Sequence, residues 1–277
     1  TAVSSRADFN EPDPKPCRHA YFRDAKKFLI GGTMSDIKVT KDGRITTVTL
    51  SRPKSMNAIT RAMHHDLQAA FDDFAGDDAQ LICVITGEGD RAFCAGSDLV
   101  EASQSSISNP DYPANGYAGL IERFDCAKPV IAGVNGLALG GGFEIALACD
   151  IIIASENASF GLPEPLVGAV ALGGGLHRLM RQIGEKQAMG LLLTAQRIDA
   201  AEAHRMGIPN AVVPADKLQA ETQRWCAEML KCSPMSLRAT KMTALRGLNE
   251  ASVADAMAAQ ESYPEFADWR TSDDAKE

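Results

Sequence analysis

Two glycine-containing segments of the chain carry residues that could bind a developing negative charge. The first, Arg91-Ala92-Phe93-Cys94-Ala95-Gly96-Ser97-Asp98-Leu99, follows an apolar run and therefore lies at the carboxyl end of an expected strand. Its small residues allow a ligand to approach the backbone closely, and its amides have no obvious sheet partner to donate to. A tight turn capped by Asp98 is the simpler interpretation of this segment alone.

The second segment, residues 135–144, places Gly140, Gly141 and Gly142 directly before an expected helix. Other residues would stabilise a helix start better, so the glycines indicate close backbone approach, with unpaired amides and the positive end of the helix dipole facing an anion or oxyanion. A tightly packed loop is the structural alternative. The segment has neither a dinucleotide-binding nor a P-loop fingerprint.

Two carboxylates accompany these segments. Glu144 falls in the first turn of the expected helix, and Glu164 follows a proline in Phe160-Gly161-Leu162-Pro163-Glu164. Each is typical of a helix start and needs no functional explanation when taken singly. Placed across one cleft, one could accept a proton from water while the other delivers a proton.

The elements that must position these residues alternate between strands and helices. Residues 37–40 and 45–50 have the period-two pattern of a hairpin around Asp42-Gly43, and the later strand and helix segments predict parallel crossovers. The expected strands cover 81–86, 130–134 and 151–154, and the expected helices cover 61–74, 117–125 and 143–149. After Leu176 the pattern indicates a helical tail, with segments at 200–206, 216–230, 234–248 and 253–260.

Composition limits the functional class. The chain has 277 residues, a net charge of -8 and seven cysteines without a metal-ligand or disulfide spacing, which predicts one main soluble domain in a reducing, cytoplasmic compartment. The negative charge argues against nucleic acid as a partner, and no apolar run is long enough to cross a membrane. The expected organisation is an irregular N-terminal arm or added leader over 1–33, a core over 34–200 and a helical region over 201–277 that packs on the core or on another subunit.

Taken in order, the motifs resemble the crotonase (enoyl-CoA hydratase/isomerase) family over roughly residue 35 to the C-terminus. The resemblance is carried by Ala92-Phe93-Cys94-Ala95-Gly96 followed by Asp98, by the three glycines before Glu144, and by the segment ending in Glu164. Further agreement comes from Arg52-Pro53-Lys54, Asn57-Ala58, Lys128 to Ala132, Ala148-Cys149-Asp150 and the region 194–207. The resemblance implies an α/β fold with a repeated ββα spiral core and a C-terminal helical layer.

The resemblance also implies roles for single residues. The backbone amides of Ser97 and Gly141 would form an oxyanion hole for a thioester carbonyl, Glu144 would activate water, and Glu164 would supply the proton at the α-carbon. The implied substrate is a 2-enoyl-CoA, coenzyme A being part of the substrate, with no other cofactor and no metal. The implied contacts are Lys54, Met56, Ala58, Ala95, Ser97, Asp98, Leu99 and Val100 for coenzyme A, and Leu172 and Gly173 for the acyl pocket.

One departure from the family pattern concerns the acyl pocket. Residues 168–175 read Gly-Ala-Val-Ala-Leu-Gly-Gly-Gly, so Ala171 and Leu172 replace a proline and a glycine that the family commonly has. We therefore expect an atypical or branched acyl group. The alternatives are a double-bond isomerase, another acyl-CoA reaction of the family, or a catalytically idle coenzyme A-binding scaffold. A homotrimer or a dimer of trimers is the expected assembly. His64 and His65 are expected to be solvated on their helix.

Overall fold

The computed structural model describes residues 36–102 and 112–275, and the expected N-terminal arm over 1–33 lies outside them. Within these residues the strands form two sheets. The larger has the order β1-β2-β3-β5-β7-β10, in which β1 pairs antiparallel with β2 and the other neighbours are parallel. Its strands are β1 (Ile37–Asp42), β2 (Ile45–Leu50), β3 (Ile82–Gly87), β5 (Val130–Val134), β7 (Ile151–Ser155) and β10 (Ala211–Val213).

The smaller sheet has the order β4-β6-β8-β9, and its first three strands are parallel. The strands of this sheet are β4 (Ala92–Cys94), β6 (Leu137–Leu139), β8 (Ser159–Gly161) and β9 (Ile198–Asp199), and β9 pairs antiparallel with β8. The chain alternates between the sheets, because β3 leads to β4, β5 to β6 and β7 to β8. Each turn of the chain therefore adds one strand to each sheet, which is the expected spiral of ββ units with intervening helices.

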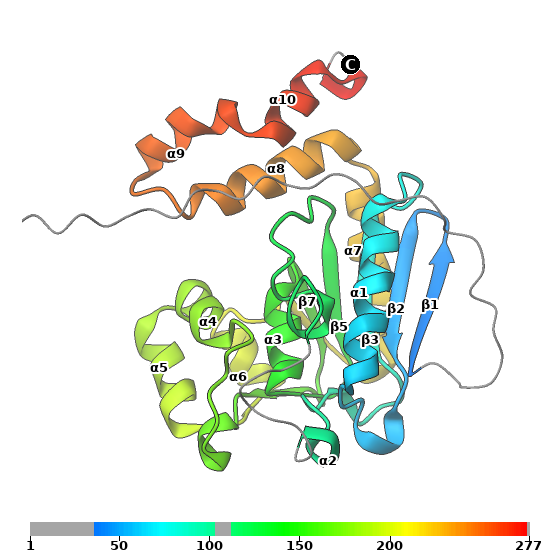
Figure 1. Ribbon diagram of the computed structural model, residues 1–277, viewed down its shortest axis with the longest axis vertical. Helices are drawn as coiled ribbons and strands as arrows, with labels where there is room; N and C mark the ends of the chain where they lie inside the picture. Colours follow the sequence, from blue (N-terminus) through cyan, green and yellow to red (C-terminus); the bar gives the residue numbers. More distant parts are fainter. Residues whose placement is uncertain (1–35, 103–111, 276–277) are drawn as a thin grey trace, which may run out of the picture. The chain divides into compact units, whose positions relative to one another are not determined.

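Helices cover both faces of the larger sheet (Figure 1), and its alternating side chains join two separate apolar clusters. Cys83 and Ile85 of β3 join the main core with α1 (Arg61–Gly76) and α3 (Gly141–Ala148), whereas Ile82 and Val84 pack on the other side with α7 (Leu218–Leu230). Burial on both faces explains why β3 and β5 read as continuous apolar runs in the sequence. The α/β class is confirmed.

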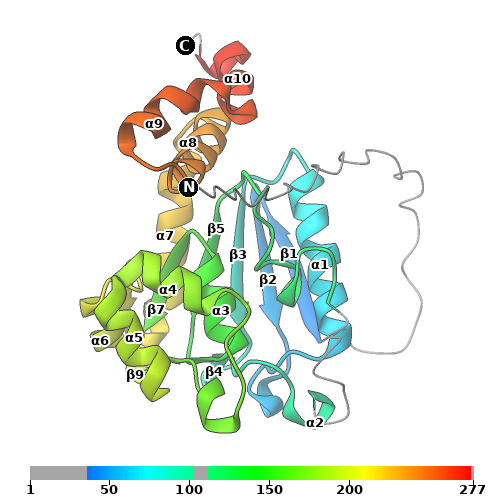
Figure 2. The ribbon, with the colours of Figure 1, turned by 60° about the vertical axis from the view of Figure 1, so that its left-hand side comes forward.

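The C-terminal part is mainly helical, as expected. Figure 2 shows α8 (Pro234–Gly247), α9 (Val253–Ala259) and α10 (Pro264–Thr271) close together, and α8 packs against both of the others. The remaining helices are α2 (Leu99–Ala102), α4 (Gly175–Ile183), α5 (Glu185–Thr194) and α6 (Ala200–Arg205). The prediction of a purely helical tail was wrong in two places, because the strands β9 and β10 also follow Leu176. Each of them lies at the edge of a sheet.

The helix expected over 117–125 was also wrong. Only the 3₁₀ turn η2 (Tyr117–Gly119) forms there, and Ala118 has a left-handed backbone with φ of 54°. Gly116 and Gly119 also have positive φ, and a side chain on Gly119 would meet the backbone of Gln68 on α1. The apolar spacing of this segment reflects a loop packed on α1 and not a helix.

Candidate active site

The expected donor segment leaves the end of β4 and pairs with the chain before α1. The Ile59 amide donates to the Gly96 carbonyl (2.8 Å) and the Asp98 amide donates to the Ile59 carbonyl (2.9 Å). This parallel bridge uses the groups on either side of Ser97. Within the described ranges, the Ser97 amide makes no hydrogen bond, so it is free to donate to a ligand.

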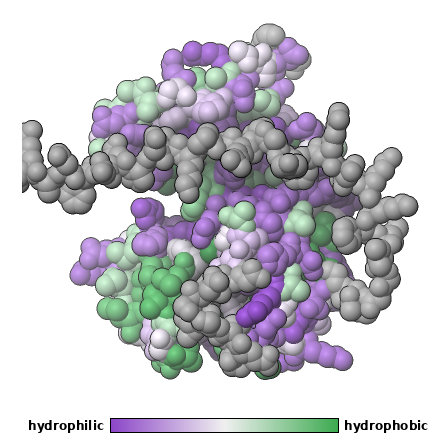
Figure 3. All heavy atoms as spheres, in the orientation of Figure 1, coloured by the Kyte–Doolittle hydropathy of each residue, from purple (hydrophilic) through white to green (hydrophobic). Residues whose placement is uncertain are grey.

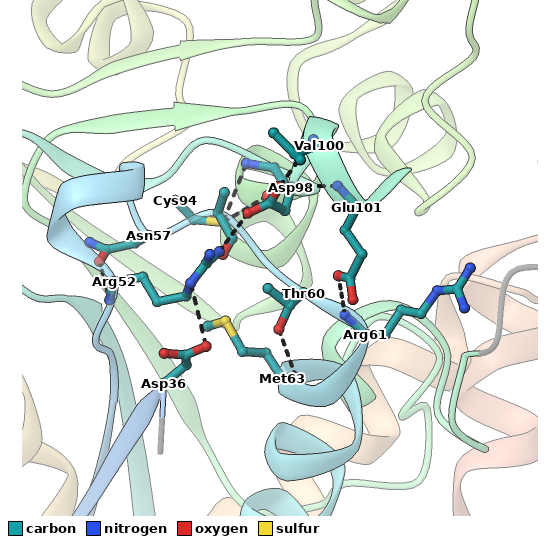
Figure 4. A network of polar contacts seen from close by, with 12 residues as sticks. Asp36, Arg52, Asn57, Thr60, Arg61, Met63, Cys94, Asp98, Val100 and Glu101 are labelled. Carbon is teal, nitrogen blue, oxygen red and sulfur yellow. Dashed lines mark hydrogen bonds and ion pairs between the residues drawn. The ribbon is translucent and has the colours of Figure 1, made fainter. Parts of the chain in front are cut away.

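A polar network fixes this segment (Figure 4). The Arg52 guanidinium lies 2.9 Å from the Asp98 carboxylate and donates to the Ala58 carbonyl at 2.7 Å. The hydrogen bond from Arg52 holds the pKa of Asp98 below its ordinary value. The buried Asn57 side chain donates to the Ala92 carbonyl (2.7 Å) and accepts from the Arg52 amide (3.0 Å). The strand end and the segment before α1 are therefore one preorganised unit.

The second expected donor begins α3. Gly141 is its first residue, and the preceding Gly140, with φ of 54°, provides no side-chain cap. The Gly141 amide consequently has no hydrogen-bond partner in the part of the chain that the structure describes. A Cβ on Gly96 would lie 3.3 Å from the Gly141 nitrogen, so the helix start and the Ser97 segment are adjacent. A Cβ on Gly142 would collide with the Cys94 carbonyl, which explains the glycine at the second position of this helix.

Glu144 lies one turn into α3 and is 4% exposed. Its Oε1 accepts from the Gly175 amide at 3.0 Å, and a side chain on Gly173 would collide with its carboxylate. Burial, with a smaller contribution from the nearby Glu164, raises the pKa of Glu144 to about 7 against the opposing hydrogen bond from the Gly175 amide. A carboxyl group with this pKa exchanges protons readily near neutral pH.

Glu164 begins the 3₁₀ turn η3 (Glu164–Val167) and points toward the same helix start. Its Oε1 would lie 3.1 Å from a Cβ on Gly140. Burial raises the pKa of Glu164, and its Oε2 is buried without a hydrogen-bond partner among the described residues. A buried carboxyl oxygen without a partner favours the protonated form, because ionisation would leave an uncompensated charge.

The residues expected to contact coenzyme A form one continuous surface region. The Ala95 amide donates to the Met56 carbonyl at 3.0 Å, which joins the two expected stretches, and Ala58 is buried behind them. Lys54, Leu99 and Val100 are exposed. Of the two residues expected at the acyl pocket, Gly173 contacts Glu144, whereas the Leu172 side chain is 81% exposed.

Two residues beside the site were not predicted. Tyr117 is buried, accepts a hydrogen bond from the Ser97 hydroxyl (3.2 Å) and packs against Gly141. His64, expected to be solvated, is instead 4% exposed and accepts from the Ala118 amide at 2.9 Å through Nδ1. The expectation failed because His64 falls on the apolar face of α1 beside Met63 and Leu67. No sequence signal marks Tyr117, since its partners are far away along the chain.

The described residues contain no group of three or more His, Cys, Asp or Glu side chains that could hold a metal ion. None of the helices within 36–102 and 112–275 has the length and apolar character needed to span a bilayer.

Comparison with known proteins agrees with these features. Residues 40–274 match the family model described as enoyl-CoA hydratase/isomerase. The chain is 41% identical over 205 residues to the carnitinyl-CoA dehydratase of Proteus mirabilis (strain HI4320), covering 74% of this chain and 78% of that protein. The protein of the same name from Salmonella typhi is 40% identical over 205 residues, with the same coverage.

Solved structures are similar throughout the fold. The crystal structure of enoyl-CoA hydratase from Mycobacterium tuberculosis H37Rv superposes with a TM-score of 0.81 at 33% identity, covering 88% of this chain and 94% of that one. The enoyl-CoA hydratase from Bacillus anthracis also gives a TM-score of 0.81, at 28% identity and the same coverage.

Proposed function

The chain belongs to the enoyl-CoA hydratase/isomerase family, and we propose that it adds water across the Cα–Cβ double bond of a 2-enoyl-CoA or removes it from the corresponding 3-hydroxyacyl-CoA. It is a hydro-lyase. The observation that carries this proposal is the meeting of two unpaired amides, at Ser97 and Gly141, with two carboxyl groups of raised pKa at the same helix start.

The amides would bind the thioester oxygen. When the oxygen of water attacks Cβ, the electron pair of the double bond moves toward the carbonyl, and negative charge builds on that oxygen. Two donors already aimed at this position stabilise the enolate without reorganising, and removing one such donor costs about 10²–10³ in rate. The positive end of the α3 dipole acts in the same direction.

The two carboxyl groups would divide the proton transfers. Glu144, with a pKa of about 7, is partly ionised at neutral pH and takes a proton from the attacking water. Burial raises the pKa of Glu164, which favours its protonated form, and in that form it gives its proton to Cα and completes the addition. In dehydration the same transfers run in reverse. A proton exchange between the two groups, through water, restores the starting state.

The acyl group is the finer part of the proposal. The curated relatives cited above are named carnitinyl-CoA dehydratases, and this chain departs from the family pattern at Ala171 and Leu172. We infer that the preferred substrate is an atypical acyl-CoA such as a carnitinyl thioester, whose acyl group carries a β-hydroxyl and a trimethylammonium group. A panel of straight-chain, branched and trimethylammonium-bearing thioesters tests this, and equal kcat/KM values across the panel would contradict it.

Coenzyme A recognition and assembly are further parts of the proposal. The backbone from Lys54 to Ala58 and from Ala95 to Val100 would hold the adenine and pantetheine, and no cofactor beyond coenzyme A in the substrate would be needed. Figure 3 shows apolar side chains gathered over the α4–α5 region. The exposed residues near Glu164 include Leu166, Val167 and Val170, which a homotrimer or a dimer of trimers would cover. Light scattering during gel filtration measures the assembly, and a monomer would contradict it.

The reaction itself is tested with a conjugated enoyl-CoA. Hydration removes the conjugated absorbance and yields a 3-hydroxyacyl-CoA. An isomerase would move the double bond without adding mass, and a thioesterase would release free coenzyme A. A scaffold would leave the thioester unchanged and still show a thermal shift with coenzyme A. Dialysis against a metal chelator is expected to leave the hydratase activity unchanged.

A further inference from the structure

Tyr117 contacts both residues that provide the candidate oxyanion amides. Its hydroxyl accepts a hydrogen bond of 3.2 Å from the Ser97 hydroxyl. The same hydroxyl would lie 2.5 Å from a Cβ on Gly141, so the end of the tyrosine ring rests on the first residue of α3. Burial raises the pKa of Tyr117 well above its ordinary range, so the phenol stays neutral. One side chain therefore spans the two donors.

The backbone that carries Tyr117 is held by α1. Ala118, the next residue along the chain, has a left-handed backbone conformation that residues other than glycine rarely adopt. His64 on α1 accepts from the Ala118 amide at 2.9 Å, and its ring lies 4.5 Å from the Tyr117 ring in an edge-on arrangement. Burial lowers the pKa of His64 to about 4, which keeps the imidazole neutral and able to accept this hydrogen bond at neutral pH. These contacts with His64 hold the backbone and the ring of Tyr117 against α1.

Ser97 is the less firmly held of the two donor residues. Gly141 belongs to a helix packed against β4, whereas Ser97 is exposed and is followed by the exposed Leu99 and Val100. The bridge to Ile59 holds the peptide groups on either side of Ser97, and among the hydrogen bonds of the described residues only that of the hydroxyl links Ser97 to the α3 side of the site. A small rotation of the Ser97 peptide would turn its amide away from a shared oxygen atom.

We propose that Tyr117 is a positioning residue that sets the spacing and direction of the Ser97 and Gly141 amides by linking the Ser97 side chain to the start of α3. The proposal rests on the proposed function, because it assigns a task to that oxyanion site. It also assigns a role to the Ser97 hydroxyl, although the group that would donate to the substrate at this position is the backbone amide.

Two substitutions cut the same link from opposite ends. Tyr117→Phe keeps the ring against Gly141 but removes the hydroxyl, and Ser97→Ala keeps the backbone amide but removes the side-chain donor. Each should lower kcat about five- to tenfold, the effect of one hydrogen bond, with KM changed by less than about twofold. The double variant should be no worse than the poorer single variant, since only one link is lost. The pH profile should stay the same because neither carboxyl group is altered.

A spectroscopic readout separates this proposal from the hydratase assignment. A cinnamoyl-CoA with an electron-donating dimethylamino group absorbs at longer wavelength when its thioester carbonyl accepts strong hydrogen bonds, whether or not it reacts. Both single variants should reduce this red shift relative to the wild-type protein. A red shift that falls while no thioester is hydrated would support Tyr117 positioning and overturn the hydratase assignment alone.

Tyr263→Phe serves as the matched control, because this tyrosine hydroxyl lies on the C-terminal helices beside Glu250. It should leave kcat and the red shift unchanged. Unchanged kcat and red shift in Ser97→Ala, which alters an exposed residue and does not threaten folding, would overturn the proposal. Multiplicative losses in the double variant would also overturn it, since they would mean that the two hydroxyls act separately.

Discussion

The two sides of the site differ in how completely their polar groups are paired. On the donor side, around Ser97, the neighbouring peptide groups, Asn57, Arg52 and Asp98 all have close partners, whereas the amide of Ser97 itself has none among the described residues. On the acid side, burial raises the pKa of both carboxyl groups, and Glu164 Oε2 has no partner within the described chain.

This difference matches two different tasks. A donor that stabilises charge must already be in place, because reorganisation during the reaction would consume the free energy that it supplies. A proton donor or acceptor must instead have two protonation states of similar free energy, which requires that its charged form is not too well solvated. Hydrogen bonds made by the groups around the amides therefore keep these donors in place, whereas incomplete hydrogen bonding of the carboxyl groups keeps their two protonation states close in free energy. The predictions below test that division, from the largest expected effect to the smallest.

The acid side should lose the most activity on substitution. Glu164→Gln keeps the shape of the side chain but cannot deliver a proton, so kcat should fall about 10²–10⁴-fold while folding is maintained. Steady-state hydration assays with circular dichroism measure both quantities. Glu156→Gln, at an exposed turn between β7 and β8, is the control and should keep full activity. A Glu164→Gln enzyme with wild-type kcat would remove Glu164 from the mechanism.

The donor side should respond strongly to a change in backbone position. Gly141→Ala forces a methyl group against Tyr117, so α3 or the tyrosine must move. We expect kcat to fall about 100-fold, as for loss of one oxyanion donor, with a cost of about 1–3 kcal/mol in the free energy of unfolding.

Gly190→Ala is the matched control, because a Cβ at this position in α5 meets no atom within 4 Å. It should keep activity and stabilise the protein by about 0.5–1 kcal/mol, as expected for replacing a helical glycine. Urea unfolding measures both variants. Normal activity of Gly141→Ala would mean that the first residue of α3 is not a donor.

Weakening the network behind Ser97 should have a smaller effect. Arg52→Met keeps the apolar stem of the side chain but removes the contacts with Asp98 and Ala58. We expect kcat/KM to fall about tenfold because the donor loses its preorganisation, with a decrease of about 2–4 °C in Tm. Arg224→Met, which breaks an exposed ion pair on α7, should leave both values unchanged. Equal behaviour of the two variants would show that the network does not position the donor.

The pH dependence of stability should reveal the cost of the acid side. The folded-state pKa of Glu144, about 7, is above the unfolded value of 4.5, so the folded state holds its proton more tightly. The corresponding stabilisation is fully present below pH 4.5 and is lost as pH rises through about 7. The loss should be about 1–3 kcal/mol.

Activity should change in the opposite direction. kcat/KM for hydration should rise as Glu144 ionises near pH 7, because only the carboxylate accepts the proton from water. Urea unfolding at several pH values should show that Glu144→Gln removes this component of the pH dependence of stability. Hydration assays of the same variant should show that most of the activity is lost. A difference in stability between Glu144→Gln and the wild type that is independent of pH would contradict the raised pKa.

The sequence predicted the parts of the molecule that have long or distinctive patterns. The predicted strand at 130–134 matches β5, and the predicted helix at 61–74 matches most of α1, because burial imposes a clear period over many residues. The motifs around Ser97, Gly141, Glu144 and Glu164 were recognised in order along the chain, and the fold brings all four together.

The remaining features depend on contacts that no local pattern records. β4, β6 and β8 have three residues each, too few to show alternation, so the residue pattern predicted no strands at these positions. Tyr117 and His64 meet only through tertiary packing, and the left-handed Ala118 contradicts the helical spacing around it. The part of the site that local sequence could not reveal is therefore the support behind the donors.

The most direct test of the account is the fate of a 2-enoyl-CoA incubated with the protein in water enriched in heavy oxygen. Mass spectrometry of the thioester should show the gain of one labelled water, with the heavy oxygen in a hydroxyl on Cβ. The Glu144→Gln and Glu164→Gln double variant should produce none. An unlabelled isomer of unchanged mass, or free coenzyme A in place of the labelled thioester, would contradict water addition at this site.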